Sequence, residues 1–216
     1  EAAASPQDSP WPGLPASPAP ANAPAVATGD APAPAAASAA ALPPDLARRA
    51  AAGEAAAGAR LAEALRRGEP RAYGQAALYC VPGSGCDPAP GDRAVALAAA
   101  QVRAGLAIRS GDPEAVYHAA LSIAHPALGR NPVRGAAWML VACRRGYDCA
   151  APGELDRAFP CAEGDAACRA ATTVEDRLSL ALGSAGYTRA FSLADDYAAG
   201  LESGEVPERA LAYGRD

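Results

Sequence analysis

The chain has no lysine: all 19 of its Lys and Arg residues are arginine, set against 24 acidic residues in 216 positions. Three of these acids lie in the first 44 residues, which leaves 21 of the 24 to accompany the 19 arginines in the rest of the chain. A nucleic-acid-binding surface needs clustered cations in excess to neutralise phosphates. This near balance therefore disfavours a nucleic-acid partner.

Long apolar runs are missing as well. A helix needs about 18 or more consecutive apolar residues to cross a bilayer, and no such run occurs, so we predict no transmembrane segment. The sequence opens on Glu1 rather than on methionine. We expect from this that a leader has been removed, as it is from an exported protein.

Proline is plentiful but unevenly placed, because 11 of the 21 prolines fall in the first 44 residues. That segment carries few large apolar side chains, so it has little to bury and is predicted to be disordered. We expect residues 1–44 to form a Pro/Ala-rich linker. Residues 45–216 are then predicted to form one folded domain, since about 170 residues suffice for a single core.

Six cysteines occur as three close pairs, each around Gly-rich or charged residues typical of turns. Such pairs indicate disulfides made in an oxidising compartment, which predicts a periplasmic or secreted protein. Local pairing is favoured, with an exchange among the last four cysteines as the alternative; six reduced, buried cysteines in a cytosolic protein are the other interpretation. A metal site is disfavoured because Cys-x-x-Cys spacing and clustered histidines are absent. The pairs are Cys80 with Cys86, Cys143 with Cys149, and Cys161 with Cys168.

The domain is predicted to be all-α. Strand-like alternation is absent and aromatic residues make up only 5% of the chain. Helix starts are marked by capping residues and by proline at a first helical position, and helix ends are marked by glycine. The expected helices run from Asp45 to Arg67, from Pro70 to Tyr79, from Arg93 to Arg109 with Asp92 as cap, from Pro113 after Asp112, from Pro132 to Gly146 after Asn131, from Thr173 with Asp176 in a capping box, and from Ser184 to Gly204.

One helix start occurs twice. The segment RSGDPEAVYHAAL from Arg109 aligns with RRGEPRAYGQAAL from Arg66, and seven of 13 positions agree at a shift of 43 residues. Three of the identities are alanines in an Ala-rich chain, but the shared Gly-acid-Pro core and the final leucine are informative. A supersecondary unit repeated at such a period is typical of stacked helix pairs, which bury their faces against one another.

The second copy carries a more specific pattern, which opens with Gly-Asp, a small residue and an aromatic residue. An amide then precedes a tryptophan by seven positions, small residues flank the tryptophan, and a glycine closes the segment. These positions are Gly111, Asp112, Ala115, Tyr117, Asn131, Ala136, Trp138, Ala142, Cys143 and Gly146. In this pattern residues 111–146 resemble a Sel1-like repeat, a relative of the tetratricopeptide repeat. The upstream copy, residues 68–110, is eroded and places Arg103 where the tryptophan should be.

The resemblance implies a short α-solenoid of antiparallel helix pairs that binds a protein or peptide on its concave face. Cys143 also falls where disulfide-bearing secreted members of the family place a half-cystine. Trp138 brings a large apolar surface and is expected to lie in the core, where Tyr117 of the partner helix can meet it. No cofactor is implied.

Catalytic or metal-binding chemistry has no positive support in the sequence, so no enzyme is expected. His118 and His125 are the only histidines, and a metal site with Glu114 is less favoured than ordinary helix and turn positions. Asp195 and Asp196 are neighbours on a predicted helix and point about 100° apart, so they suit a solvated face better than an acid/base pair.

The leading hypothesis is a non-catalytic protein- or peptide-binding helical repeat protein of the bacterial envelope. Arginines near helix ends, Arg66 and Arg67 among them, could form a ridge that grips carboxylates, although such cations also complement helix dipoles. The alternative is a small secreted inhibitor or immunity-type protein that acts through the disulfide-closed loop 80–86. The candidate binding residues are Tyr73, Tyr117, Arg109, Arg144, Arg145 and Tyr147.

Overall fold

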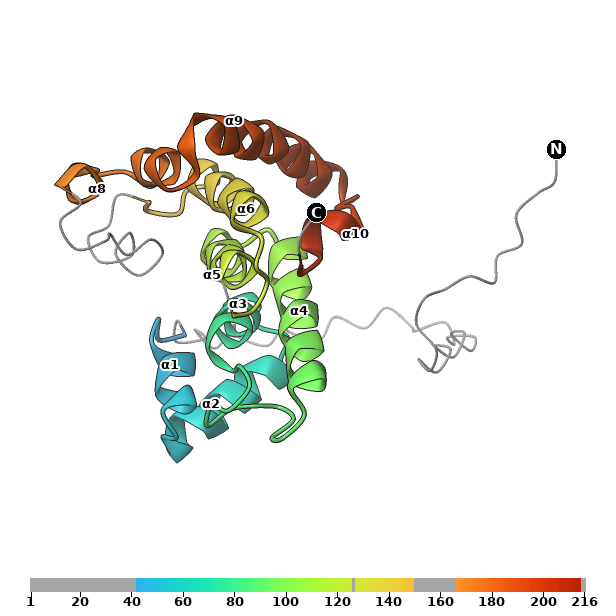
Figure 1. Cartoon of the computed structure of the whole chain (residues 1–216). Helices are drawn as coiled ribbons and strands as arrows, with labels where there is room; N and C mark the ends of the chain where they lie inside the picture. The colour runs from blue at the N-terminus through green and yellow to red at the C-terminus, as the bar shows by residue number, and fades with distance from the viewer. Residues whose placement is uncertain (1–41, 126, 150–165, 215–216) are drawn as a thin grey trace, which may run out of the picture. The chain divides into compact units, whose positions relative to one another are not determined.

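The computed structural model describes residues 42–125, 127–149 and 166–214, and within these ranges the chain is helical and contains no strand. The predicted linker lies outside the described residues except for its last three positions. The helices, shown in Figure 1, are α1 (Leu46–Ala51), α2 (Ala55–Arg66), α3 (Pro70–Tyr79), α4 (Arg93–Arg109), α5 (Pro113–Ala124), α6 (Pro132–Arg144), α8 (Ala166–Ala170), α9 (Val174–Ser203) and α10 (Glu208–Leu211). None of the described helices is long and apolar enough to span a membrane.

The starts of α4, α5 and α6 follow the predicted capping chemistry. Asp92 accepts hydrogen bonds from the amides of the second and third residues of α4, at 3.0 and 3.1 Å. Asp112 accepts from the Ala115 amide at 2.9 Å, and Asn131 accepts from the Arg134 amide at 2.9 Å. Each of these side chains satisfies an amide that has no partner within its helix, which fixes where the helix begins.

The expected single helix from Asp45 to Arg67 is wrong. The structure divides this stretch into α1 and α2, and Gly53 between them has a left-handed φ of 88°. The Asp45 side chain also makes no capping hydrogen bond. Alanine-rich sequence on both sides hides the break, because the turn depends on one glycine that can adopt a positive φ without steric cost.

The later helical region agrees with the prediction more closely. Thr173 accepts a hydrogen bond from the Asp176 amide at 3.1 Å and so begins α9. Within α9, Gly183 has non-helical dihedrals, with φ 67° and ψ 171°, so a new helical segment starts at Ser184 as expected. Gly204, with φ 77°, ends it.

Helix α5 lies at the centre of the packing. It contacts α3, α4 and α6, while α6 also contacts α9, and α1 and α2 pack on α3 (Figure 1). Two glycines let helices approach closely. A Cβ on Gly135 of α6 would lie 2.6 Å from the Ala124 Cβ of α5, and a Cβ on Gly74 of α3 would lie 2.6 Å from the Ala115 carbonyl oxygen. Larger residues at these two positions would therefore push α6 or α3 away from α5.

The buried side chains form two clusters, which we name the small core and the large core. The small core lies among α1, α2 and α3 and consists of Leu46, Ala47, Ala50, Ala57, Leu61, Ala64, Ala72, Ala76 and Cys80. The large core involves α3 to α6, α9 and α10 and contains the bulkiest buried side chains. Trp138 is completely buried there and stacks on Tyr197 at a centroid distance of 4.6 Å. Tyr117, expected to meet Trp138, stacks on Tyr147 at 4.1 Å.

Two of the predicted local disulfides are present. Cys80 is bonded to Cys86 and Cys143 to Cys149, each across a sequence separation of 6. Local pairing is therefore confirmed for these four cysteines, and the reduced interpretation is wrong for them. The third predicted pair lies outside the described side chains. Two disulfides are compatible with an oxidising compartment such as the periplasm or the cell exterior.

The segment after α9 crosses back over the large core. Glu208 in α10 forms an ion pair with Arg109 of α4, and Leu211 is almost fully buried. Farther along, the Tyr213 hydroxyl lies 2.8 Å from the Ser122 hydroxyl of α5. The amide of Gly214 donates to the Gly129 carbonyl at 2.6 Å. We refer to residues 207–214 as the strap.

Candidate functional site

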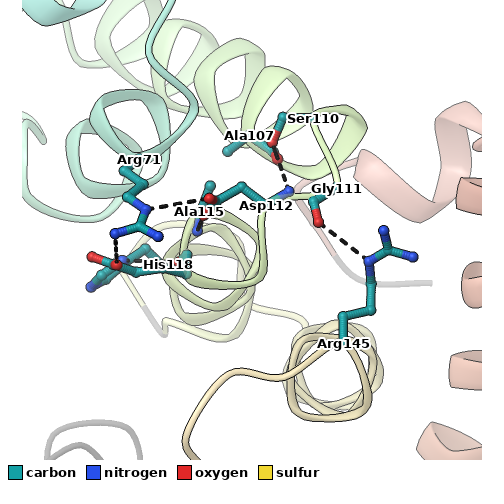
Figure 2. A network of polar contacts seen from close by, with 9 residues as sticks. Arg71, Ala107, Ser110, Gly111, Asp112, Ala115, His118 and Arg145 are labelled. Atoms are coloured by element: carbon teal, nitrogen blue, oxygen red, sulfur yellow. Dashed lines mark hydrogen bonds and ion pairs between the residues drawn. The ribbon is translucent and has the colours of Figure 1, made fainter. Parts of the chain in front are cut away.

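A connected polar cluster lies at the start of α5 (Figure 2). The Arg71 Nε of α3 donates to the Asp112 carboxylate at 3.3 Å, and its Nη1 lies 2.8 Å from the Glu114 carboxylate. Asp112 is at the same time the cap of α5. One guanidinium thus joins two carboxylates at the beginning of the neighbouring helix, which makes the cluster a link between α3 and α5.

The two histidines take structural positions. His118 is buried and its Nδ1 lies 3.1 Å from the Glu114 carbonyl oxygen, one turn earlier in the same helix. His125 follows the end of α5, where its Nδ1 accepts from the Ala127 amide at 3.1 Å. In the described part of the chain no group of three or more His, Cys, Asp or Glu side chains is arranged to hold a metal ion. The geometry assigns both rings to backbone contacts.

The arginines proposed as a binding ridge have intramolecular partners. Arg109 pairs with Glu208, and Arg144 Nη1 lies 2.6 Å from the Asp195 carboxylate. Arg145 donates to the Gly111 carbonyl at 3.2 Å. Arg66 and Arg67 both pair with Glu63, and Arg67 also pairs with Glu69. The contacts of Arg109, Arg144 and Arg145 join separate elements, and Asp195 forms an interhelix ion pair, whereas Arg66 and Arg67 pair locally at the end of α2.

The tyrosines selected as contact residues differ in exposure. Tyr117 is completely buried, so its selection as a surface contact is wrong; its ring fills the space beside Tyr147 in the large core. Tyr147 is half-buried by that stacking. Tyr73 is also half-buried, and its hydroxyl donates to the Leu65 carbonyl at 3.2 Å. Helical periodicity predicts on which side of the helix Tyr117 lies, but it does not predict that Tyr147 covers that side.

The disulfide-closed loop 80–86 rests on α1. The Gly85 amide donates to the Ala51 carbonyl at 2.8 Å, and a Cβ at Gly85 would lie 2.7 Å from the Ala50 carbonyl oxygen. Gly83 is the exposed tip, and its amide donates to the Asp87 carboxylate at 2.7 Å. One side of the loop is therefore used to hold α1 against the end of α3.

A surface that the sequence did not reveal lies on α4. The core-facing side of α4 is mostly alanine, whereas three larger aliphatic residues face solvent. Val95, Val102 and Leu106 are 52%, 63% and 42% exposed. These three residues lie at spacings of seven and four, so they follow one side of the helix. We call them the α4 apolar face. The spacing could have been recognised in the sequence, but small residues do not reveal which side of a helix is buried.

The charge on α4 is of one sign. The helix carries Arg93, Arg103 and Arg109 and no acidic residue. Burial lowers the pKa of Arg103, which Asp87 partly offsets by raising it. Within the described residues the buried Nη1 of Arg103 has no hydrogen-bond acceptor. The α4 apolar face thus belongs to a helix whose charged residues are all arginine and whose core-facing residues are mostly small.

No family model, curated protein or solved structure matches this chain.

Proposed function

We propose that this chain is a non-catalytic helical repeat protein that binds a protein or peptide in the bacterial envelope. The observation that carries the proposal is the α4 apolar face, where two valines and a leucine are left in solvent while alanines occupy the core side of the same helix. Exposing aliphatic side chains on one side of a helix is unfavourable in water, and burial against a partner would recover that free energy.

The order of helix contacts supports the repeat architecture. Helices α3 and α4 pack together, as do α5 and α6, and α5 also contacts both members of the first pair. Arg71 and Glu114, which occupy equivalent positions in the two copies of the helix start, meet at 2.8 Å. This is the arrangement expected of antiparallel pairs stacked as a Sel1-like solenoid, in which each repeat contacts its neighbours. The two disulfides support a location in the periplasm or outside the cell.

The proposal is tested by polar substitutions that leave the charge unchanged. We expect Val102→Gln with Leu106→Gln to lower crosslinked capture of a stoichiometric partner from envelope extract about tenfold or more, since removing central apolar contacts commonly weakens an interface by that factor. The full chain is used, folded with its disulfides intact. Far-UV circular dichroism should be unchanged, because both side chains are exposed.

A matched control carries Ala59→Gln and Ala62→Gln on the exposed side of α2. This variant should capture the partner as the parent chain does. Equal capture by all three proteins would contradict the proposal. If capture is lost only when residues 81–85 are replaced, the inhibitor or immunity-type alternative, acting through the disulfide-closed loop, would take its place.

A further inference from the structure

The strap is bound to α6 through its backbone carbonyl groups. Trp138 Nε1 donates to the Ala210 carbonyl at 2.7 Å, Arg134 Nη1 donates to the Ala212 carbonyl, and Asn131 Nδ2 donates to the Gly214 carbonyl at 3.2 Å. The acceptors are alternate residues of the strap. The donors follow one side of α6 from its cap, Asn131, to Trp138. Their order is the reverse of the order of the acceptors, so the strap runs opposite to the helix.

The spacing of the donors suits an extended peptide. Residues three or four apart on a helix are displaced by about 4.5 to 6 Å along its axis, and two residues of an extended chain advance by about 6.6 Å. The three donors are almost fully buried, with Asn131, Arg134 and Trp138 all among the buried residues. Because the acceptors belong to the backbone, this part of the recognition does not depend on the sequence of the bound segment.

The side chains of Leu211 and Tyr213, which lie between these carbonyls in the sequence, contact α4 and α5. Leu211 is almost fully buried beside Gly105 of α4, where a Cβ on the glycine would lie 3.7 Å from the Leu211 Cδ1. Tyr213 shares a hydrogen bond of 2.8 Å with Ser122 of α5. Burial raises the pKa of Tyr213 to about 12, although the Ser122 hydrogen bond lowers it. These two positions hold an aliphatic side chain and a tyrosine separated by one residue.

The strap is joined to α9 by an exposed connection. Ser203, Gly204 and Glu205 are exposed, and Gly204 has a left-handed φ of 77°. The chain therefore turns from α9 to the strap through exposed residues. The contacts that hold the strap also resemble recognition of a separate peptide, with backbone hydrogen bonds for affinity and two side-chain sites for specificity.

We propose that α4, α5 and α6 form a binding site for an extended peptide segment of a partner protein with an aliphatic-x-tyrosine pattern, and that the strap occupies this site in cis. This goes beyond the proposed function, because the site uses Asn131, Trp138 and Ser122 and not the α4 apolar face. The partner segment replaces the strap residue for residue: its carbonyls take the three donors and its two side chains take the places of Leu211 and Tyr213.

The test frees the strap without removing it before folding. A protease recognition sequence is inserted after Gly204 in the full chain, the protein is folded with its disulfides, and the connection is then cut. The probe is a fluorescein-labelled peptide with the sequence of residues 205–216. We expect the cut protein to bind this peptide saturably in fluorescence anisotropy while the uncut protein does not, because a covalently attached strap has the higher effective concentration.

Matched variants of the peptide and the protein make the result specific. Peptides with Leu211→Asp or Tyr213→Ser should bind about tenfold more weakly or worse, whereas the exposed Arg209→Ala should leave affinity unchanged. In the cut protein, Trp138→Phe keeps an aromatic ring but removes the donor to Ala210, and it should also weaken binding about tenfold. Val102→Gln with Leu106→Gln should bind the peptide normally.

Three outcomes would overturn the proposal. If the cut protein loses its circular dichroism when the strap leaves, the strap is an integral part of the core. If all the peptides bind equally well, no aliphatic-x-tyrosine pattern is recognised. If the uncut protein instead forms dimers by sedimentation that the Tyr213→Ser substitution abolishes, the occupant is the strap of a second copy and not a partner segment.

Discussion

The small core and the large core reach burial by different means. The small core holds two leucines and one cysteine among six alanines, so each residue removes little apolar area from water. The large core holds Trp138, Tyr117, Met139 and Tyr197, and its aromatic rings are stacked. Hydrophobic stabilisation follows buried apolar area. The large core is therefore expected to account for most of the free energy of unfolding.

The small core compensates with directed bonds. Gln75 is completely buried, accepts from the Ala47 amide at 3.1 Å and donates to the Pro43 carbonyl at 3.1 Å, so one side chain attaches α3 to the start of α1. The disulfide from Cys80 to Cys86 closes the loop that rests on the same helix. The comparison indicates that small residues let helices pack closely, whereas polar contacts and the disulfide determine which helices pack against one another.

The largest effect is expected from Trp138→Ala. Loss of the indole leaves a cavity beside Tyr197 and removes the donor to the Ala210 carbonyl, so we expect a loss of about 3 to 5 kcal/mol in the free energy of unfolding. Leu61→Ala in the small core should cost less, about 2 to 3 kcal/mol. Both are measured by chemical denaturation, with the exposed Phe191→Ala as control. A larger loss for Leu61 would reverse our ranking of the two cores.

A smaller effect is expected from the disulfides. Each closes a loop with a sequence separation of 6, so replacing either pair by alanine should cost about 2 kcal/mol through the unfolded state. Because the two loops are equally long, a difference in the free energy of unfolding between the two double variants reflects packing in the folded state. We expect Cys80→Ala with Cys86→Ala to cost more than Cys143→Ala with Cys149→Ala, since Cys80 is buried in the small core. Equal denaturation midpoints for the two double variants would contradict this ranking.

The two copies of the helix start should also differ. Asp112 caps α5 and contacts Arg71, so Asp112→Ala is expected to cost about 1 kcal/mol or slightly more. Glu69 makes no capping hydrogen bond at the start of α3, and its pairing with Arg67 is at the surface. Glu69→Ala should therefore cost only a few tenths of a kcal/mol. Thermal unfolding of the two variants checks this, and similar losses would contradict the assignment.

The smallest effect is confined to alkaline solution. Burial raises the pKa of Tyr213 from 10.0 to about 12, so the folded state keeps its proton where the unfolded state loses it. The associated stability is fully present below pH 10 and is lost as the pH rises toward about 12. Denaturation of the parent and Tyr213→Phe at several alkaline pH values tests this. A Tyr213→Phe protein with the same pH dependence as the parent would exclude Tyr213 as the cause.

Local features could be predicted from the sequence, and long-range ones could not. The starts of α4, α5 and α6 follow from Asp92, Asp112 and Asn131, because the cap and the amide it binds are two or three residues apart. The cysteine spacing likewise indicated the two disulfides. Trp138, in contrast, donates to a carbonyl 72 residues away, and no periodicity relates those positions.

The candidate sites were missed for a related reason. Helical spacing places Val95, Val102 and Leu106 on one side of α4, but it predicts that such a side faces the core. In α4 the opposite holds, since its alanines permit the close contact with α3 and α5. The strap contains only a short helix, so most of its backbone carbonyls have no partner within the strap. The side chains that bond to them are aligned only once α6 has folded, and the sequence does not reveal that alignment.

The contact between Arg71 and Glu114 bears on how the duplicated segment could have multiplied. The two residues occupy equivalent positions 43 apart and carry opposite charges. A further tandem duplication of the second segment would set glutamate beside glutamate at the new junction, and copying the first would set arginine beside arginine. Like charges placed in contact destabilise the packing of two helices. A further unit added at this junction would therefore be less stably joined unless the new copy changed its charge, so the polarity of this ion pair favours ending the repetition here.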